Sequence, residues 1–342
     1  MARRAGKPRL VVKISILIVL LQTGFVLILR SSESSLRISD SVKTIGEGHR
    51  KIKVDKNLAA TGDRNVSKKI LRLCDIDVSR SVGNTGVTKN FTISLQEVSQ
   101  KLQGIGPGGK WNPRNCLARN SVTIVVPFRD RWGHLAVFLN FMHPFLQRQL
   151  LKYRILVVEQ IGIGVYNKAM LMNAAFLETR QHFPTDCIIF HDVDLIPELN
   201  NNSYACAKGP RHLAPAVDEL GYHLLYGRLV GGVLMFTPQD FQAVNGYSNA
   251  YWGWGAEDDD MGYRIKKAGL TLSRPSLNTG RYTMLVHKHR RKNTRRFEIL
   301  DKGMQRQPWD GLSNVNYSVL GIRLKPLFTH MLIDIGKTPD TY

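Results

Sequence analysis

The sequence has 342 residues and a hydrophobic content of 43%, which supports a sizeable core and excludes a disordered chain. The formal net charge of +21 raises the question of nucleic acid, because basic chains bind polyanions. Residues 1–72 hold sixteen Lys or Arg against five Asp or Glu, so about half of the excess lies in this N-terminal stretch. The charge therefore argues only weakly for a nucleic-acid-binding domain.

An uncharged apolar segment, ISILIVLLQTGFVLIL, covers residues 14–29. Basic residues precede it, and no small-x-small cleavage site closes it, which favours a membrane anchor over a cleaved signal peptide. We therefore expect a cytoplasmic tail at 1–13, a transmembrane signal anchor at 14–29, a flexible stem at 30–73 and a lumenal domain at 74–342. A span of sixteen residues suits thinner membranes, so we predict a single-pass type II protein of the Golgi membrane, separated from nucleic acid.

Four cysteines, all on the expected lumenal side, indicate disulfides. They are Cys74, Cys116, Cys187 and Cys206. An even number in an oxidising compartment favours bridges over buried free thiols, and the CxxC spacing of metal sites is absent. The sequence alone leaves all three pairings open.

Three β-branched apolar runs in the expected lumenal domain predict strands. They lie at residues 121–128, 153–160 and 187–197, and a helical pattern occupies 166–180 between the second and the third. Strands that alternate with a helix predict an α/β domain with a parallel sheet. Ligands of such sheets bind at the carboxyl ends of the strands.

The motif DVD follows the third run. On an extended chain, Asp192 and Asp194 share one face while Val193 turns toward the core. One carboxylate can then ligate Mg²⁺ or Mn²⁺ while the other accepts hydrogen bonds from a sugar. The alternative is an ordinary solvated loop.

A thioether and an imidazole lie close together in the later sequence TMLVHKHRR. Met284 and His287 are three residues apart, and in a helix or turn such a pair can face one ion. A soft thioether ligand favours Mn²⁺ over Mg²⁺ or Ca²⁺. The alternative is a core methionine and a surface histidine.

Several motifs resemble one enzyme family. In chain order they are PFRDRWGHL, HPFLQRQ, FHDVDLIP, GGV, NGYSNAYWGWGAEDDDMGYRI, SRP and MLVH. Together they closely resemble the β-1,4-galactosyltransferases, inverting Golgi enzymes with the GT-A fold, over roughly residues 74–335. The resemblance implies a Rossmann-like nucleotide-binding sheet, a UDP-sugar donor and a glycan acceptor that ends in GlcNAc.

The resemblance also implies roles for individual residues. Asp258 would be the catalytic base, and Glu257 would hold the donor sugar. Trp254 would lie against both sugars on a loop that Gly253 and Gly255 allow to close. For Asp259 and Asp260 we expect a structural role, because a helix that begins near Glu257 favours acids there.

The remaining implied roles concern the metal, the disulfides and the two substrates. The metal ligands would be Asp194, Met284 and His287, with Mn²⁺ as cofactor, and the bridges would be Cys74–Cys116 and Cys187–Cys206. Donor binding would involve Arg129, Arg131, Tyr166, Lys168, Asp192, Leu229 and Gly232. Acceptor binding would involve Trp254, Asp258, Arg296, Phe297 and Leu300.

Leu229 indicates which donor sugar the protein uses. Galactose-transferring members commonly carry Tyr at this place, two residues before the first glycine of GGV. An aliphatic side chain leaves room for an N-acetyl group, as in members that resemble β-1,4-N-acetylgalactosaminyltransferases. We therefore expect transfer of GalNAc from UDP-GalNAc in β1,4 linkage, with UDP-Gal as the alternative donor and a catalytically silent glycan-binding protein as a further alternative.

Overall fold

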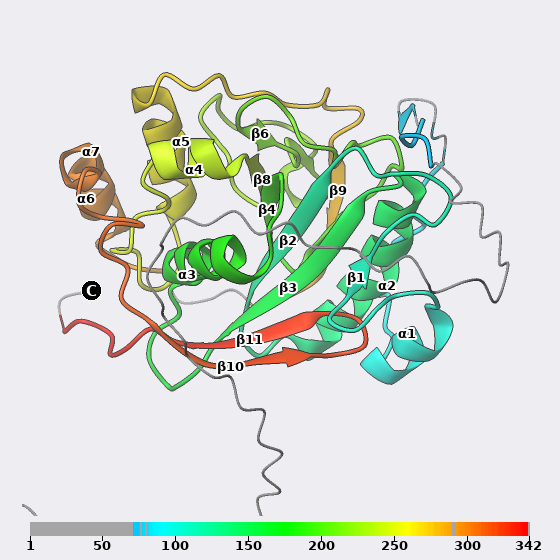
Figure 1. Cartoon of the computed structure of the whole chain (residues 1–342). Coiled ribbons are helices and arrows are strands. Elements are labelled where there is room, and N and C mark those ends of the chain that lie inside the picture. The colour runs from blue at the N-terminus through cyan, green and yellow to red at the C-terminus, as the bar shows by residue number, and fades with distance from the viewer. Residues whose placement is uncertain (1–70, 76, 79–80, 82, 289–291, 341–342) are drawn as a thin grey trace, which may run out of the picture. The chain divides into compact units, whose positions relative to one another are not determined.

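The computed structural model describes residues 71–75, 77–78, 81, 83–288 and 292–340 (Figure 1). The tail, the transmembrane helix and nearly all of the stem expected at residues 1–73 lie outside these ranges. Within the ranges, no helix is both long and apolar enough to cross a bilayer. The described residues belong to one compact unit.

A mixed eight-stranded sheet forms the centre of the unit, in the order β10-β11-β3-β2-β4-β8-β6, with β1 paired to β3. Strands β2, β3, β4 and β11 are parallel, whereas β1, β8, β6 and β10 pair antiparallel with their neighbours. The expected sheet was parallel, so the prediction holds for its centre and is wrong at its edges. The strand bounds are β1 Lys110–Trp111, β2 Ser121–Phe128, β3 Lys152–Gln160, β4 Cys187–His191, β6 Arg211–His212, β8 Val233–Phe236, β10 Ser318–Leu324 and β11 Thr329–Asp334.

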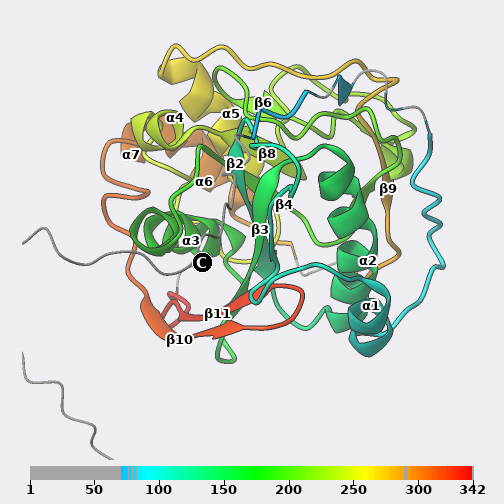
Figure 2. The ribbon, with the colours of Figure 1, turned by 45° about the vertical axis from the view of Figure 1, so that its right-hand side comes forward.

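Helices cover both faces of this sheet, with α1 and α2 on one face and α3 on the other (Figures 1 and 2). Alternate residues of β2 pack into the two resulting cores: Ile124 contributes to the α2 side and Val125 to the α3 side. This two-sided burial explains why the strand is almost continuously apolar. The helix bounds are α1 Leu95–Lys101, α2 Trp132–Arg148, α3 Lys168–His182, α4 Pro238–Ala243, α5 Glu257–Lys267, α6 Arg296–Asp301 and α7 Gly303–Arg306.

The third predicted strand is interrupted at the DVD motif. Strand β4 ends at His191, the chain turns at residues 192–194, and β5 (Leu195–Pro197) begins a second sheet. The backbone N–H of Leu195 donates to the carbonyl oxygen of Asp192 at 3.3 Å, which closes the turn. The expectation of an extended chain through both aspartates is therefore wrong. The turn directs the chain from one sheet into the other.

The second sheet has three strands, in the order β5-β9-β7, and brings distant segments together. Strand β9 (Arg281–Met284) lies between β5 and β7 (Ala216–Val217), and the 3₁₀ turn η2 (Asp218–Leu220) follows β7. Leu195 pairs directly with Met284. The register therefore places the end of β9 beside the DVD turn.

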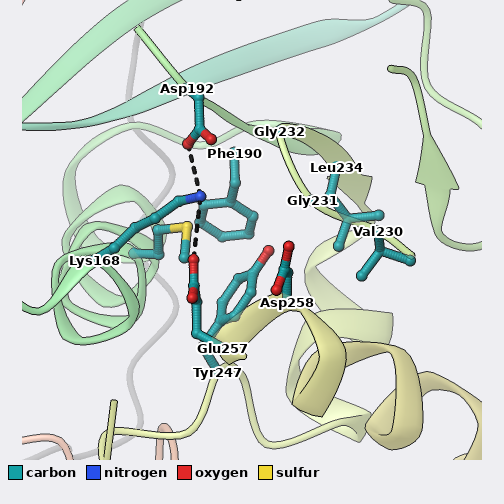
Figure 3. A pocket seen from close by; sticks show the side chains of 11 residues that line it. Lys168, Phe190, Asp192, Val230, Gly231, Gly232, Leu234, Tyr247, Glu257 and Asp258 are labelled. Atoms are coloured by element: carbon teal, nitrogen blue, oxygen red, sulfur yellow. Dashed lines mark ion pairs between the residues drawn. The ribbon is translucent and has the colours of Figure 1, made fainter. Parts of the chain in front are cut away.

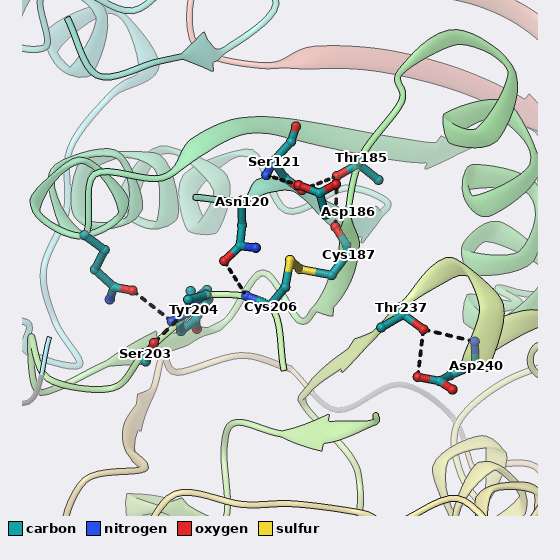
Figure 4. The surroundings of a disulfide bond; sticks show 12 residues. Asn120, Ser121, Thr185, Asp186, Cys187, Ser203, Tyr204, Cys206, Thr237 and Asp240 are labelled. Carbon is teal, nitrogen blue, oxygen red and sulfur yellow. Dashed lines mark hydrogen bonds between the residues drawn. A yellow bond between two sulfur atoms is a disulfide. The ribbon is translucent and has the colours of Figure 1, made fainter. Parts of the chain in front are cut away.

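Two disulfides brace the unit, and their pairing is the one that the resemblance implies. Cys74 pairs with Cys116 and Cys187 pairs with Cys206, with Cα–Cα distances of 4.9 and 5.7 Å. Cys187 is the first residue of β4, and the amide side chain of Asn120 accepts a hydrogen bond from the backbone of Cys206 (Figure 4). The second bridge thus anchors the strand that leads to the DVD turn.

Candidate active site

A cavity of about 890 Å³ opens where β2 and β4 end and where α3 and α5 begin. Nearly every substrate or metal residue expected from the sequence lines it: Arg129, Arg131, Tyr166, Lys168, Asp192, Asp194, Leu229, Gly232, Trp254, Glu257, Asp258, Met284, His287, Arg296 and Phe297. Leu300 is different, because it lies further along α6, half-buried and outside the lining. The cavity is large enough for a nucleotide sugar.

One wall combines Arg129 with an aromatic ring. Its guanidinium carbon lies 5.4 Å from the centre of the Tyr166 ring, and its Nη1 donates to the carbonyl oxygen of Gly164 at 2.7 Å. Tyr166 is buried to 9% exposure. The pair therefore offers a fixed, flat surface at the position where the resemblance implies the uracil ring.

Asp194 lies at the centre of the expected metal set. Its Oδ2 is 2.7 Å from Nη1 of Arg131 and 3.3 Å from Nδ1 of His287. The backbone N–H of Leu285 donates to the carbonyl oxygen of Asp194 at 2.8 Å, which ties the segment after β9 to the DVD turn. Burial and the charge of Asp192 raise the pKa of Asp194. A cation beside this carboxylate would offset both effects.

The donor set fits a borderline cation. A carboxylate, an imidazole and the thioether of Met284 line one region of the cavity, and mixed hard and soft ligands of this kind suit Mn²⁺. Among the described residues, no cluster of three His, Cys, Asp or Glu could hold a metal, because the third member here is a methionine. Met284 ends a strand and His287 follows in irregular chain, so the pair does not lie on one helix. The pairing of β9 with β5 brings Met284, and with it the following segment that holds His287, beside the DVD turn.

Lys168 neutralises the acidic end of the cavity. Its Nζ lies 2.7 Å from Oδ1 of Asp192 and 3.5 Å from Oε1 of Glu257 (Figure 3). Burial lowers the pKa of Lys168, but the charges of the two carboxylates outweigh burial and raise it well above its ordinary value. Lys168 is therefore a permanent cation between two carboxylates that line the cavity.

Asp258 faces the same space from the first turn of α5 (Figure 3). A Cβ atom at Gly231 would lie 2.3 Å from its Oδ2, so the close approach requires glycine there. Burial, followed by the charge of Glu257, raises the pKa of Asp258 to about 7. A carboxylate with this pKa can take up a proton near neutral pH, as a general base must.

The other two acids of α5 differ from each other. Asp260 is fully buried, and its carboxylate accepts hydrogen bonds from Nε of Arg264 at 2.5 Å and from the hydroxyl of Tyr251 at 3.1 Å. Asp259 lines the cavity and accepts a hydrogen bond from the hydroxyl of Tyr226 at 2.6 Å. The expected structural role is thus consistent with the contacts of Asp260, whereas Asp259 also forms part of the cavity wall.

An exposed aromatic platform closes the other side. Trp254 and Phe297 are 49% and 63% exposed. The guanidinium of Arg296 lies 5.3 Å from the Trp254 ring and 4.5 Å from the Phe297 ring. Gly255, at φ 115°, adopts a backbone conformation that favours glycine, and a Cβ atom there would contact Arg296 at 2.7 Å. Exposed aromatic faces of this kind suit sugar rings.

Two supporting residues were missed in the sequence. Arg274 donates through Nη2 to the carbonyl oxygens of Gly227 and Leu229 at 2.7 and 2.9 Å, and through Nε to Nδ1 of His212 at 3.2 Å. His212 in turn contacts the carbonyl oxygen of Gly231 at 2.9 Å, and burial lowers its pKa to about 3. A neutral imidazole can donate to one partner and accept from the other. Of the two, only Arg274 could have been found from the sequence, because it lies in the SRP motif.

Comparison with known proteins identifies the family of this chain. The family described as the N-terminal region of glycosyl transferase group 7 matches residues 74–207, and that described as the N-terminal domain of galactosyltransferase matches residues 211–288. Human β-1,4-galactosyltransferase 3 is 40% identical over 262 residues, which cover 75% of this chain and 67% of that protein. Mouse β-1,4-galactosyltransferase 2 is 39% identical over 260 residues, which cover 75% and 70%. The match thus spans about two thirds of the relatives' length.

A solved structure is also similar. It is that of a variant of Drosophila β-1,4-galactosyltransferase 7 in complex with manganese, UDP-Gal and xylobiose. It is 32% identical, has a TM-score of 0.55 and covers 64% of this chain and 95% of that one. The expected GT-A type fold is confirmed, and so is the expected family. This chain belongs to the β-1,4-galactosyltransferases, a family of metal-dependent glycosyltransferases that use UDP-sugars.

Proposed function

We propose that this chain transfers galactose from UDP-Gal, with inversion, to form a β1,4 linkage to a terminal GlcNAc of a glycoconjugate. One observation carries the proposal: the candidate base, the candidate metal ligands and the aromatic platform line a single cavity. The names of the relatives support galactose as the sugar, which favours the alternative donor over the GalNAc first expected.

The chemistry of the proposed reaction centres on Asp258. Its carboxylate takes the proton of the acceptor hydroxyl while that oxygen attacks the anomeric carbon of the donor. The bond from the anomeric carbon to the diphosphate oxygen breaks on the opposite face, so the configuration inverts. Trp254 orients the two sugars, and the closed loop excludes water, which limits hydrolysis of the donor.

The diphosphate end of the donor belongs near the DVD turn. Asp194, Met284 and His287 would hold Mn²⁺ there. When bound, Mn²⁺ supplies positive charge that stabilises the departing UDP. Arg131, now paired with Asp194, has the forked donors that suit a phosphate.

Leu229 favours a second candidate, transfer of GalNAc from UDP-GalNAc. Its aliphatic side chain lines the same cavity as Gly231 and lacks the hydroxyl of the tyrosine that galactose-transferring members commonly carry. The space gained would accept an N-acetyl group. A single contact of this kind changes selectivity by about 1–3 kcal/mol.

The Golgi membrane remains the proposed location, with residues 1–13 cytosolic and the catalytic unit lumenal. The two disulfides support an oxidising compartment.

The test is release of UDP by the full chain in detergent, with Mn²⁺ and a β-linked GlcNAc acceptor. UDP-Gal and UDP-GalNAc are compared at equal concentrations, and the product linkage is determined by NMR. Release that depends on both the metal and the acceptor supports transfer, and the faster donor decides between the two candidates. A silent glycan-binding protein would bind the acceptor and release no UDP from either donor.

A further inference from the structure

A small recess lies at the floor of the cavity, between the end of β4 and the start of α5 (Figure 3). Its volume of about 10 Å³ is close to the least that holds one water-sized group. It shares Lys168, Asp192, Glu257 and Asp258 with the large cavity, so the two spaces adjoin. Phe190 and Leu234 belong to its apolar wall.

Tyr247 lines this recess with a hydroxyl that the reaction proposed above does not use. Only 4% of the residue is exposed. Among the described residues, no group forms a hydrogen bond with that hydroxyl, and Figure 3 shows it pointing toward Asp258. Burial raises the pKa of Tyr247 far above its ordinary value, so the phenol keeps its proton. The hydroxyl is not among the fully buried polar atoms of the described residues that lack a partner, so it is open to the recess, where it can donate to or accept from a group that enters.

The position of Tyr247 is fixed from several sides. Its backbone N–H donates to Oδ1 of Asn173 at 2.9 Å, and its carbonyl oxygen accepts from Nδ2 of the same side chain at 2.7 Å. Its ring packs edge-on against Phe190 at 5.5 Å and lies 5.8 Å from Phe241. The hydroxyl therefore cannot turn away to find another partner without disturbing the core.

We propose that this recess binds one hydroxyl group of the donor sugar and that the hydroxyl of Tyr247 is its hydrogen-bond partner. The inference rests on the proposed function, because it places the donor sugar beside Asp258. One oxygen fills the recess, and a group as large as N-acetyl does not fit. An ordered water has the same chemistry, so the experiment must distinguish it from the sugar.

The variant Tyr247→Phe tests the contact, because it removes the hydroxyl and keeps the ring. We measure the affinities of UDP-Gal and of UDP in the presence of Mn²⁺ by calorimetry, and kcat/KM for transfer. The affinity for UDP-Gal and kcat/KM should fall about 3- to 10-fold, while the affinity for UDP stays unchanged. Unchanged affinity and kcat/KM for UDP-Gal would overturn the proposal.

Tyr153→Phe is the matched control. Tyr153 is also buried, but its hydroxyl bonds Nδ1 of His143 at 2.8 Å in the core on the α2 side of the sheet. This variant should lose stability without any change in donor affinity. A comparable loss of donor affinity in the control would show that the effect of Tyr247→Phe is not local, and would overturn the contact.

Deoxy analogues of UDP-Gal, each lacking one hydroxyl of the sugar, separate the sugar from water. One analogue should bind the native protein 3- to 10-fold more weakly and show no further loss in Tyr247→Phe. If Tyr247→Phe weakens the binding of UDP-Gal and of every analogue by the same factor, the recess holds a water molecule. That result overturns the proposal. If the variant does not fold, the native protein decides, because native affinity for every analogue equal to that for UDP-Gal also overturns it.

These binding measurements need no turnover, so they separate this inference from the proposed function. A native protein that binds UDP-Gal no better than UDP rejects the proposed donor, and the series is then repeated with UDP-GalNAc. If the native protein transfers galactose normally and Tyr247→Phe has no effect, the recess proposal is rejected and the proposed function stands.

Discussion

The Nζ atom of Lys168 lies 2.7 Å from a carboxylate oxygen of Asp192, and this ion pair joins the start of α3 to the turn after β4. Glu257 lies on the other side of the same cation at 3.5 Å. Three segments that are far apart in the sequence are thus held together by one positive charge. Lys168 therefore has a structural role in addition to any contact with the donor.

We expect Lys168→Met to destabilise the protein by about 1–3 kcal/mol at pH 7.5. The change leaves two carboxylates unpaired, but their side chains are partly exposed, which reduces the cost below that of a fully buried pair. Urea unfolding measures the difference. Lys168→Arg keeps the charge and should retain most of the stability. Equal loss in both variants would mean that packing, not charge, is responsible.

Asp258→Asn should lower the transfer rate about 10²- to 10⁴-fold, because it removes the basic carboxylate with little change in shape. Calorimetry should find that UDP and Mn²⁺ still bind. Asp240→Asn on α4, away from the cavity lining, serves as a control and should transfer normally. Near-normal turnover in Asp258→Asn would exclude this residue as the base.

The raised pKa of Asp258, about 7, has two consequences for pH dependence. The value of kcat/KM should fall tenfold per pH unit below about 7, because only the carboxylate accepts a proton. The folded state binds this proton more tightly than the unfolded state, so the stability contribution is complete below pH 4 and is lost as pH rises through 7. Asp258→Asn should therefore raise Tm relative to the native protein at pH 8 and much less at pH 4. A Tm difference independent of pH would contradict the raised pKa.

His287→Ala should raise the Mn²⁺ concentration needed for half-maximal activity by about tenfold or more. The imidazole lies 3.3 Å from Asp194, and loss of one ligand in three weakens a metal site strongly. Mn²⁺ binding followed by electron paramagnetic resonance gives a readout independent of turnover. His182→Ala, at the exposed end of α3, is the control and should bind Mn²⁺ as the native protein does. Unchanged binding in His287→Ala would exclude the ligand.

Leu229→Tyr should shift the ratio of kcat/KM for UDP-Gal over UDP-GalNAc toward UDP-Gal by about tenfold or more. The phenol would occupy the part of the cavity at position 229 that an N-acetyl group would need. Both donors are measured in both proteins under the same conditions. Leu225→Tyr, on the rim of the cavity, is the control for added bulk and should leave the ratio unchanged. A constant ratio in Leu229→Tyr would remove this residue from donor selection.

The central strands could be predicted from sequence because burial on both faces makes them continuous apolar runs. The range 121–128 matches β2 at both ends. The DVD turn could not be predicted, because it depends on strand β5 joining a different sheet. The pairing of Leu195 with Met284 is a contact between residues far apart in the chain, and no local pattern specifies its register.

The candidate site could likewise be predicted only in part. The acids of α5 and the expected metal ligands were found through motifs that resemble a family. Arg274 and His212 act through backbone carbonyls, and only Arg274 lies in a sequence motif, SRP, that marks it. Tyr247 has the pattern of an ordinary core aromatic in the sequence, and only the structure shows that it lines the recess beside Asp258.

The bridge between Cys74 and Cys116 determines where a shortened recombinant chain should begin. A chain that starts at residue 75 would keep both sheets and all cavity residues, yet it would leave the thiol of Cys116 without its partner. In an oxidising medium such a thiol forms disulfides between molecules, and the product aggregates. Secreted forms for crystallisation or assay should therefore start before Cys74.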